Sequence, residues 1–283
     1  MIFDEKQREY KIDIKGFYKK ISNKNPGIHC ITNIVSANDC ANILLAAGAS
    51  PIMAQHLLEA AEISRGCDAL VCNFGATSAY EAMNAAALEA SALNHPIVAD
   101  PVGVGASQYR RRSFLEFINR FKISCIRGNI SEIKSLYLGS TSTKGVDADI
   151  ADFVNKENLP QTVKFAKEFA KKTGSVIVIT SAIDIVADSE TAYCIHNGDA
   201  MMSRITGSGC QLSAMMAAYI SANKEDTLKA ALACVCAMGL CGEIAKKRMS
   251  EQDGNSTYRN YLIDAVYNLS PEDLEKGARY EIG

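Results

Sequence analysis

The chain has 283 residues, enough for one large domain or two small ones with a sizeable core. Its 30 basic and 32 acidic residues leave a net charge of −2, which argues against a nucleic-acid-binding or anionic-membrane surface. No apolar run reaches the roughly 18 residues of a membrane-spanning helix, and the opening "MIFDEKQREYKIDIKGFYKK" is too charged for a signal peptide. We therefore expect a cytoplasmic protein without nucleic-acid or membrane partners.

The N-terminal third combines a charged segment with a helix rich in small residues. Residues 1–25 are more charged than the fold needs, and we assign them no role. Residues 27–55 begin as a short strand and continue as the helix "SANDCANILLAAG", which ends at Gly48. Asn33 precedes this helix and either caps local backbone or contacts polar atoms of a ligand. Met53 follows the helix and is either ordinary core or a contact for a flat aromatic ligand.

Continuous apolar runs alternate with helical patterns through the middle of the chain. The apolar runs predict strands buried on both faces, at 68–74, 95–102, 123–128 and 174–180. Helices are expected between them, at 78–93, 110–121 and 159–174. The last of these ends with two lysines and a glycine, a typical helix end. This alternation predicts βαβ units and a parallel sheet with helices on both faces.

The pattern changes after Thr180. Residues 184–198 alternate apolar and polar side chains around "DSET", which predicts an antiparallel hairpin at the edge of the sheet. From Cys210 to the C-terminus the pattern is helical, with helices at 210–222, at about 225–247 and twice more after Gly254. No linker divides the chain, so we expect a single α/β domain over residues 1–283.

Ten cysteines are spread through the chain without a CxxC pair, mostly in apolar surroundings. Histidine and cysteine do not cluster at the spacing of metal ligands. In a cytoplasmic protein this pattern predicts reduced, buried cysteines.

Polar residues at the carboxyl ends of the predicted strands are the candidates for a site, because ligands of open α/β sheets bind there. Asp100 lies near the end of one predicted strand and Thr180 ends another, and Arg127 and Glu132 lie at and after the end of a third. Carboxylates together with substrate phosphates hold Mg²⁺ in kinases, and a guanidinium suits phosphate oxygens. The alternative is a structural pair between the arginine and a carboxylate.

A glycine-containing turn stands directly before the helix at 210–222. The first amides of a helix have no internal partner and the helix dipole is positive there, so Gly207, Ser208 and Gly209 form a candidate phosphate-binding turn. The alternative is a plain turn that caps a core helix. Cys210 stands at the same helix start, where the pKa of a thiol is expected to be lowered, so it is either a base or polar contact or one more core cysteine. Together with the strand-end residues, the turn suggests phosphoryl transfer.

Six strings, "HCITN", "GASPIMA", "DPVGVGA", "RGNISEI", "KGVD" and "RITGSGCQLSA", resemble the hydroxyethylthiazole kinase family in order and spacing, from about Gly27 to about Ala222. The resemblance implies a ribokinase-like fold of three α/β/α layers with a mostly parallel sheet. It implies transfer of the γ-phosphate of ATP, with Mg²⁺, to the alcohol of 4-methyl-5-(2-hydroxyethyl)thiazole in thiamine biosynthesis. It also implies a homotrimer with active sites between neighbouring subunits.

The resemblance further implies roles for individual residues. These are substrate contacts for Asn33, Met53 and Gly207, ATP contacts for Arg127 and Thr180, and Mg²⁺ and phosphate contacts for Asp100 and Glu132. Cys210 stands where most ribokinase-like enzymes have an aspartate base, so it either tunes hydroxyl deprotonation or only shapes the pocket. Two departures from the family pattern, Ser181 and Phe74, are expected to affect nucleotide affinity and helix–sheet packing rather than the turn.

Two alternatives stay open. One is an enzyme of the same fold that acts on another small alcohol, such as hydroxymethylpyrimidine. The other is a catalytically silent sensor of phosphate or thiamine, which would bind its ligand without releasing ADP.

Overall fold

One nine-stranded sheet organises the molecule, in the order β2-β1-β3-β4-β5-β6-β7-β8-β9. The computed structural model describes residues 12–138, 154–155 and 157–283, so "KGVD" at 144–147 lies outside the described residues. The strands are β1 (Gly27–Ile31), β2 (Ser50–Ile52), β3 (Ala69–Asn73), β4 (Ile97–Asp100), β5 (Cys125–Asn129), β6 (Val176–Thr180), β7 (Asp184–Ala187), β8 (Ala192–Ile195) and β9 (Tyr280–Ile282). Strands β1 to β6 pair in parallel, and β6 to β9 pair antiparallel.

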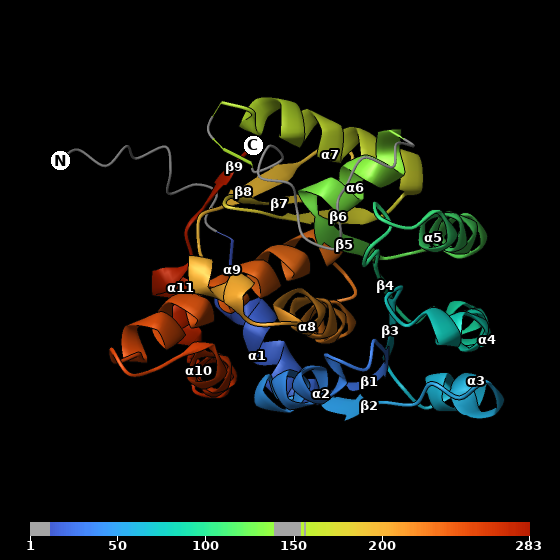
Figure 1. The fold of residues 1–283 in the computed structure, drawn as a ribbon, viewed down its shortest axis with the longest axis horizontal. Coiled ribbons are helices and arrows are strands. Elements are labelled where there is room, and N and C mark those ends of the chain that lie inside the picture. The colour runs from blue at the N-terminus through green and yellow to red at the C-terminus, as the bar shows by residue number, and fades with distance from the viewer. Residues whose placement is uncertain (1–11, 139–153, 156) are drawn as a thin grey trace.

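Helices cover both faces of this sheet, as the alternating pattern predicts. The described helices are α1 (Ile14–Lys24), α2 (Ala37–Ala46), α3 (Leu57–Arg65), α4 (Tyr80–Ala92), α5 (Gln108–Arg120), α6 (Ile130–Leu138), α7 (Leu159–Thr173), α8 (Ser208–Ala222), α9 (Thr227–Arg248), α10 (Asn255–Tyr267) and α11 (Pro271–Gly277). Figure 1 shows α1, α2 and α8–α11 on one side of the sheet and α3–α7 on the other. The three-layer α/β/α arrangement is therefore confirmed.

The two halves of the core follow from the alternation of side chains along each strand. Ala69 and Val71 of β3 belong to the apolar cluster under α8 and α9, whereas Leu70 and Cys72 belong to the cluster under α4 and α5. Because both faces are covered, the parallel strands consist mainly of apolar residues. All ten cysteines are buried and unpaired, as the sequence predicts.

Three predicted helices and four predicted strands of the middle region are present, with ends shifted by a few residues. Helix α7 ends as predicted, because Lys171 and Lys172 occupy its last turn and Gly174 follows with φ 68°. The hairpin of β7 and β8 is also present, but it is not the outermost part of the sheet. Strand β9 pairs with β8 and forms the edge, so the C-terminus is not helical throughout.

The charged N-terminal segment, to which we assigned no role, contains a packed helix. Asp13 caps α1, its carboxylate accepting a bond from the Gly16 amide. Ile14 and Ile21 are buried against the core, and Lys24 Nζ donates to the Ala222 carbonyl at the end of α8. Residues 13–24 therefore anchor the C-terminal helices.

Helix α9 is the one described helix that is long and apolar enough to cross a membrane by length and composition, a segment that we did not predict from the sequence. Its apolar window is 72% buried inside the fold. It packs against α8, α10 and the strands of the antiparallel hairpin. These contacts are those of a core helix, which is apolar on all sides because it is covered on all sides.

Candidate active site

The carboxyl ends of the parallel strands bring most of the predicted site residues to one edge of the sheet. Asp100 ends β4, Thr180 ends β6, and Arg127 lies in β5 between them. Asn33 follows β1 by two residues, and Met53 follows β2 directly. Neighbouring parallel strands end at the same edge, so five strands contribute to one rim.

The turn before α8 has the geometry expected of an anion-binding turn. Gly207 is the N-cap of α8 with φ 78°, in the left-handed region that favours glycine. A Cβ at Gly207 would lie 2.8 Å from the Ser36 Cβ, so a side chain at this position would also clash. Within the described chain, the amides of Ser208, Gly209 and Cys210 have no hydrogen-bond acceptor. These amides are the N–H groups that a helix start offers to a phosphate.

Arg127 faces this turn and joins it to the strand ends. A Cβ at Gly209 would lie 2.6 Å from Arg127 Nη2, so only glycine lets the guanidinium approach α8 this closely. Nη2 also donates to Thr180 Oγ1 at 2.7 Å, and Nη1 lies 3.6 Å from Asp100 Oδ2. Only 8% of Arg127 is exposed, and in the described structure its Nε has no partner. The guanidinium is thus held in place against the turn before α8.

Asp100 is fully buried, and its two oxygens have different surroundings. Oδ2 accepts hydrogen bonds from Ser213 Oγ at 2.8 Å and from Asn73 Nδ2 at 3.1 Å, and it faces Arg127. Oδ1 has no partner among the described residues. Burial raises the pKa of Asp100, and the charge of Arg127 opposes this shift.

Glu132 lies near Asp100 but uses both oxygens for backbone contacts. Oε1 accepts from the Gly103 amide at 3.0 Å, and Oε2 accepts from the Asn129 amide at 2.9 Å. Asn129 Oδ1 accepts in return from the Glu132 amide, which makes a reciprocal cap at the start of α6. Burial, and next the charge of Asp100, raise the pKa of Glu132 to about 7.

These contacts decide which residues fit a magnesium ion. No group of three or more His, Cys, Asp and Glu side chains that could hold a metal occurs among the described residues. Mg²⁺ in kinases needs only one or two carboxylates, because phosphates and waters complete its shell. The free Oδ1 of Asp100 fits a direct ligand. Glu132, with an amide on each oxygen, fits a contact through water better than a direct one.

The structure contradicts the expected low pKa of Cys210. The thiol lies at the start of α8, but burial and the nearby charge of Asp100 raise its pKa to about 12. Sγ accepts hydrogen bonds from Asn73 Nδ2 at 3.2 Å and from Asn33 Nδ2 at 3.4 Å. The helix-terminus effect is worth less than the cost of burying a thiolate beside a carboxylate. At neutral pH the group is a thiol, which suits shaping the pocket better than removing a proton.

Asn33 lies inside the polar cluster, whereas Met53 lies at its border. Asn33 Nδ2 donates to Asn73 Oδ1 at 3.3 Å, and its Oδ1 accepts from Ser36 Oγ at 3.0 Å. Met53 is half-buried and packs against the apolar cluster under α8. The backbone beside it is held by His29 of β1, whose Nε2 lies 2.7 Å from the Ala54 carbonyl.

Sequence reasoning missed three polar residues that the structure brings to the site: Ser36, Asn73 and Ser213. Ser36 packs under Gly207, and Ser213 lies one turn after Cys210 and reaches Asp100. Asn73 directly precedes Phe74, and no motif in the sequence marks it as a site residue. Its contacts come from elements far apart in sequence, so local pattern could not identify it.

The two departures from the family pattern occupy the expected places. Phe74 packs among Tyr80, Phe114 and Phe117, with ring centroids 4.8–5.3 Å apart, in the core under α4 and α5. Ser181 follows Thr180, and its hydroxyl accepts a bond from the Val154 amide at 2.8 Å. Ser181 therefore has a structural contact beside the strand-end rim.

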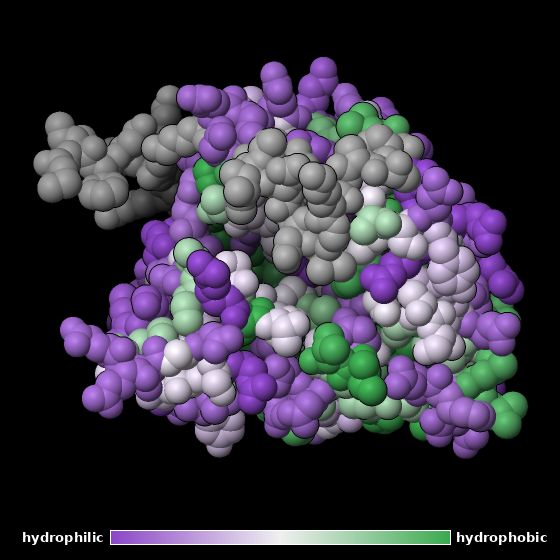
Figure 2. Space-filling view, viewed as in Figure 1, coloured by the Kyte–Doolittle hydropathy of each residue, from purple (hydrophilic) through white to green (hydrophobic). Residues whose placement is uncertain are grey.

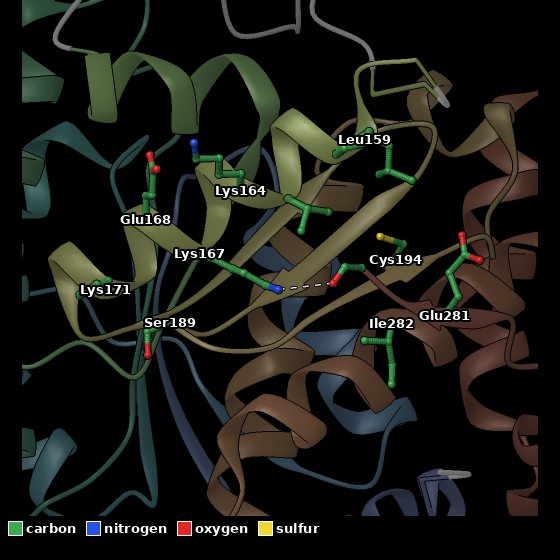
Figure 3. A pocket seen from close by; sticks show the side chains of 12 residues that line it. Leu159, Lys164, Lys167, Glu168, Lys171, Ser189, Cys194, Glu281 and Ile282 are labelled. Atoms are coloured by element: carbon green, nitrogen blue, oxygen red, sulfur yellow. Dashed lines mark hydrogen bonds between the residues drawn. The ribbon is translucent and has the colours of Figure 1, made fainter. Parts of the chain in front are cut away.

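A separate pocket of about 520 Å³ lies between α7 and strands β8 and β9 (Figure 3). Lys164, Lys167 and Lys171 of α7 lie along it, with Cys194 and Ile282 opposite. None of the predicted site residues lines it. The strand-end rim and the turn before α8 remain the candidate site.

The fold and the candidate site together indicate the class of protein. The mostly parallel α/β/α sheet, which carries an amide turn, an arginine and a buried carboxylate at its strand ends, has a ribokinase-like fold. A ribokinase-like superfamily protein from Enterococcus faecalis matches the fold with a TM-score of 0.61 at 13% identity, covering 91% of this chain and 95% of that one.

Comparison with known proteins then identifies the family. The model of the hydroxyethylthiazole kinase family matches residues 18–272. A hydroxyethylthiazole kinase of Clostridium acetobutylicum is 54% identical over 95% of this chain and 99% of its own length, and one of Methanobrevibacter smithii is 42% identical over 93% and 94%. The structure of a hydroxyethylthiazole kinase protein from Pyrococcus horikoshii matches with a TM-score of 0.84 at 29% identity, over 95% of this chain and 98% of that one. The chain belongs to the hydroxyethylthiazole kinase family.

Proposed function

We propose that this protein transfers the γ-phosphate of ATP to the hydroxyl of 4-methyl-5-(2-hydroxyethyl)thiazole, and that the product serves thiamine biosynthesis. The observation that carries the proposal is the turn before α8. Three amides without acceptors in the described chain point from the helix start, next to Arg127 and Asp100. Family membership supports the thiazole alcohol as the acceptor.

The role of each residue follows from where charge develops on the transferred phosphoryl group. Phosphoryl transfer has a loose transition state with charge on the equatorial oxygens, so catalysis is mainly positioning and electrostatic stabilisation. The amides of Ser208, Gly209 and Cys210 would stabilise that charge, and Arg127 would neutralise phosphate oxygens beside Thr180. Asn33 and Met53 would hold the thiazole alcohol near the turn. The neutral Cys210 thiol would shape the pocket rather than act as a strong base.

Magnesium is the proposed metal of this site. Asp100 would hold it through the free Oδ1, and Glu132 would contact it through water. When bound, Mg²⁺ would neutralise charge on the nucleotide phosphates. The separate contribution of the protein is to keep Asp100 oriented and Arg127 in reach of the turn.

Self-association in a homotrimer is supported by an apolar surface next to Met53. We name the mouth patch by its members, which are Ile34, Val35, Ile52, Leu57 and Leu58, with exposures of 88%, 68%, 37%, 45% and 87%. Ile34 and Val35 follow β1, Ile52 ends β2, and Leu57 and Leu58 begin α3. Figure 2 shows hydrophobic residues grouped low in the centre of the molecule. Neighbouring large apolar residues exposed together mark interaction surfaces. A neighbouring subunit on this patch would complete the pocket beside Met53.

We also propose that the chain acts as one kinase domain in the cytoplasm. A single sheet runs through the described residues, and the reaction requires ATP, which is a cytoplasmic co-substrate.

An ADP-release assay tests the proposal. The purified protein is incubated with ATP and Mg²⁺ and either hydroxyethylthiazole or hydroxymethylpyrimidine, beside a Cys210→Ala variant and an EDTA control. We expect ADP release that depends on the thiazole alcohol, stops with EDTA and persists in the variant. Faster turnover of the pyrimidine would assign another substrate. Thiazole binding without ADP release would identify a sensor instead.

A further inference from the structure

Asn73 lies at the centre of the polar cluster and is nearly inaccessible. It ends β3, between β1 and β4, and only 1% of it is exposed. In the register of the sheet it stands beside Asp100. A buried amide costs free energy unless its donors and acceptors are satisfied, so its contacts matter.

All four hydrogen-bonding positions of this amide are used. Nδ2 donates to Asp100 Oδ2 at 3.1 Å and to Cys210 Sγ at 3.2 Å. Oδ1 accepts from the Gly75 amide at 2.9 Å and from Asn33 Nδ2 at 3.3 Å. The chemistry of the partners settles which atom is nitrogen, because a carboxylate needs a donor and a backbone amide needs an acceptor.

The strand itself does not depend on this side chain. The backbone continues its pairing beyond β3 through the Phe74 amide, which donates to the Asp100 carbonyl at 2.9 Å. The following turn closes between the Ala76 amide and the Asn73 carbonyl at 3.0 Å. The side-chain bonds are therefore directed mainly at residues of the candidate site.

We propose that Asn73 is a positioning residue that holds the two halves of the active site in register. Its N–H side fixes the Asp100 carboxylate on the phosphate side and Cys210 beside the turn. Its carbonyl side fixes Asn33 on the substrate side. With Asn73, Ser213 and Arg127 all at Oδ2, the Oδ1 of Asp100 is left for a ligand. This inference rests on the proposed function, since it names a residue that serves the same reaction.

Three variants separate the two sides of the amide. Asn73→Leu keeps the approximate volume and removes all four bonds. Asn73→Asp keeps the oxygen that accepts from Asn33 and Gly75 and replaces the NH2 group, which donates to Asp100 and Cys210, with a second oxygen. Ser213→Ala is the matched control, because it removes one donor to Asp100 without touching Cys210 or Asn33. Each protein is measured for kcat, for KM of the alcohol, and for calorimetric Kd of the alcohol and of Mg·ADP, with a melting temperature as the fold check.

We expect Asn73→Leu to raise the alcohol Kd about three- to tenfold, the effect of one lost neutral hydrogen bond, and to lower kcat about 100-fold through misplacement. Asn73→Asp should leave the alcohol Kd within about twofold of the wild type but lower kcat at least tenfold and weaken Mg·ADP binding. Ser213→Ala should leave the alcohol Kd unchanged. A purely structural role would lower the melting temperature and the active fraction without this split between the two ligands.

The proposal is overturned if Asn73→Leu binds both ligands like the wild type, or if Asn73→Asp keeps the wild-type kcat. A wild-type protein that binds hydroxyethylthiazole and Mg·ADP but releases no ADP would refute the proposed function. The two binding measurements would still decide whether Asn73 positions both sides.

Discussion

At the scale of single residues, the Cys210 thiol is defined by its surroundings rather than by its place at a helix start. Two amide groups donate to its sulfur, and burial beside Asp100 raises its pKa to about 12. A group with a pKa that far above neutrality stays protonated throughout the range in which kinases are assayed. The thiol is therefore a small, polarisable acceptor in the wall of the site.

A Cys210→Ser variant tests this state. We expect kcat within about tenfold of the wild type, because a hydroxyl accepts the same amides. Between pH 7 and 10, the pH profile of kcat should have the same shape in both proteins. Iodoacetamide at pH 8 should leave Cys210 of the native protein unmodified while it alkylates the urea-unfolded chain. Rapid alkylation of Cys210 in the native protein would mean that a thiolate takes part. So would a pH-dependent change in kcat that is present in the wild type and absent in the variant.

Three of the predicted site residues could be identified because their position in a strand already indicates a role. Asp100 and Thr180 end apolar strands, and Arg127 is a charge within one, so each demands a partner or a ligand. Asn73 ends a strand too, yet its partners belong to β1, β4 and α8. The Cys210 pKa was predicted wrongly for a related reason. The burial and the neighbouring carboxylate that raise it come from other parts of the chain.

At the scale of elements, His29 ties three of them together behind Met53. Its Nε2 lies 2.7 Å from the Ala54 carbonyl after β2, and its Nδ1 lies 2.9 Å from Ser64 Oγ in α3. A carbonyl only accepts, so Nε2 carries the proton and Nδ1 accepts from the serine. Burial lowers the pKa of His29, although the Ala54 bond and the charge of Glu59 oppose this.

The sign of this shift predicts a pH dependence of stability. Below the unfolded pKa of about 6.5 the unfolded chain binds a proton that the folded state resists, so His29 makes the fold less stable as pH falls. We expect the urea midpoint of the wild type to fall more between pH 7.5 and pH 5 than that of His29→Gln. The comparison cancels the contributions of other groups. An equal fall in both proteins would contradict a buried neutral His29.

Helices and strands with a clear hydrophobic periodicity could be predicted from the sequence. Those that depend on contacts with a distant part of the chain could not. Strands β3–β6 and helices α4, α5 and α7 follow from apolar runs and amphipathic spacing. Helix α1 was hidden in a charged segment, because only two of its residues, Ile14 and Ile21, are buried. Strand β9 has three residues and exists through its pairing with β8. Such a strand has little signature of its own in sequence.

At the scale of the whole molecule, the mouth patch predicts the state of assembly. Leu58 is 87% exposed at the start of α3, next to the loop that carries Met53. We expect the wild type to sediment as a trimer and Leu58→Lys to sediment as a smaller species, because a charge within an apolar interface is costly to bury. Loss of the interface should also lower kcat at least tenfold, since the pocket beside Met53 would stay open.

Leu88→Lys provides the matched control for this test. Leu88 is 58% exposed on α4, outside the mouth patch. This variant should remain trimeric and keep the wild-type kcat. A wild type that sediments as a monomer with full activity would refute both the trimer and the role of the patch.

Steady-state turnover of a Gly207→Val variant bears most directly on the phosphate-binding turn. Gly207 has φ 78°, and a Cβ there would meet Ser36 at 2.8 Å, so valine must displace the amides that follow. We predict that kcat for hydroxyethylthiazole falls about 10²–10³-fold, the usual effect of losing one oxyanion donor. Gly66→Ala, whose added Cβ would have only the Ile63 carbonyl within reach at 3.7 Å, should keep the wild-type rate. A folded Gly207→Val variant with wild-type kcat would show that these amides do not hold the transferred phosphoryl group.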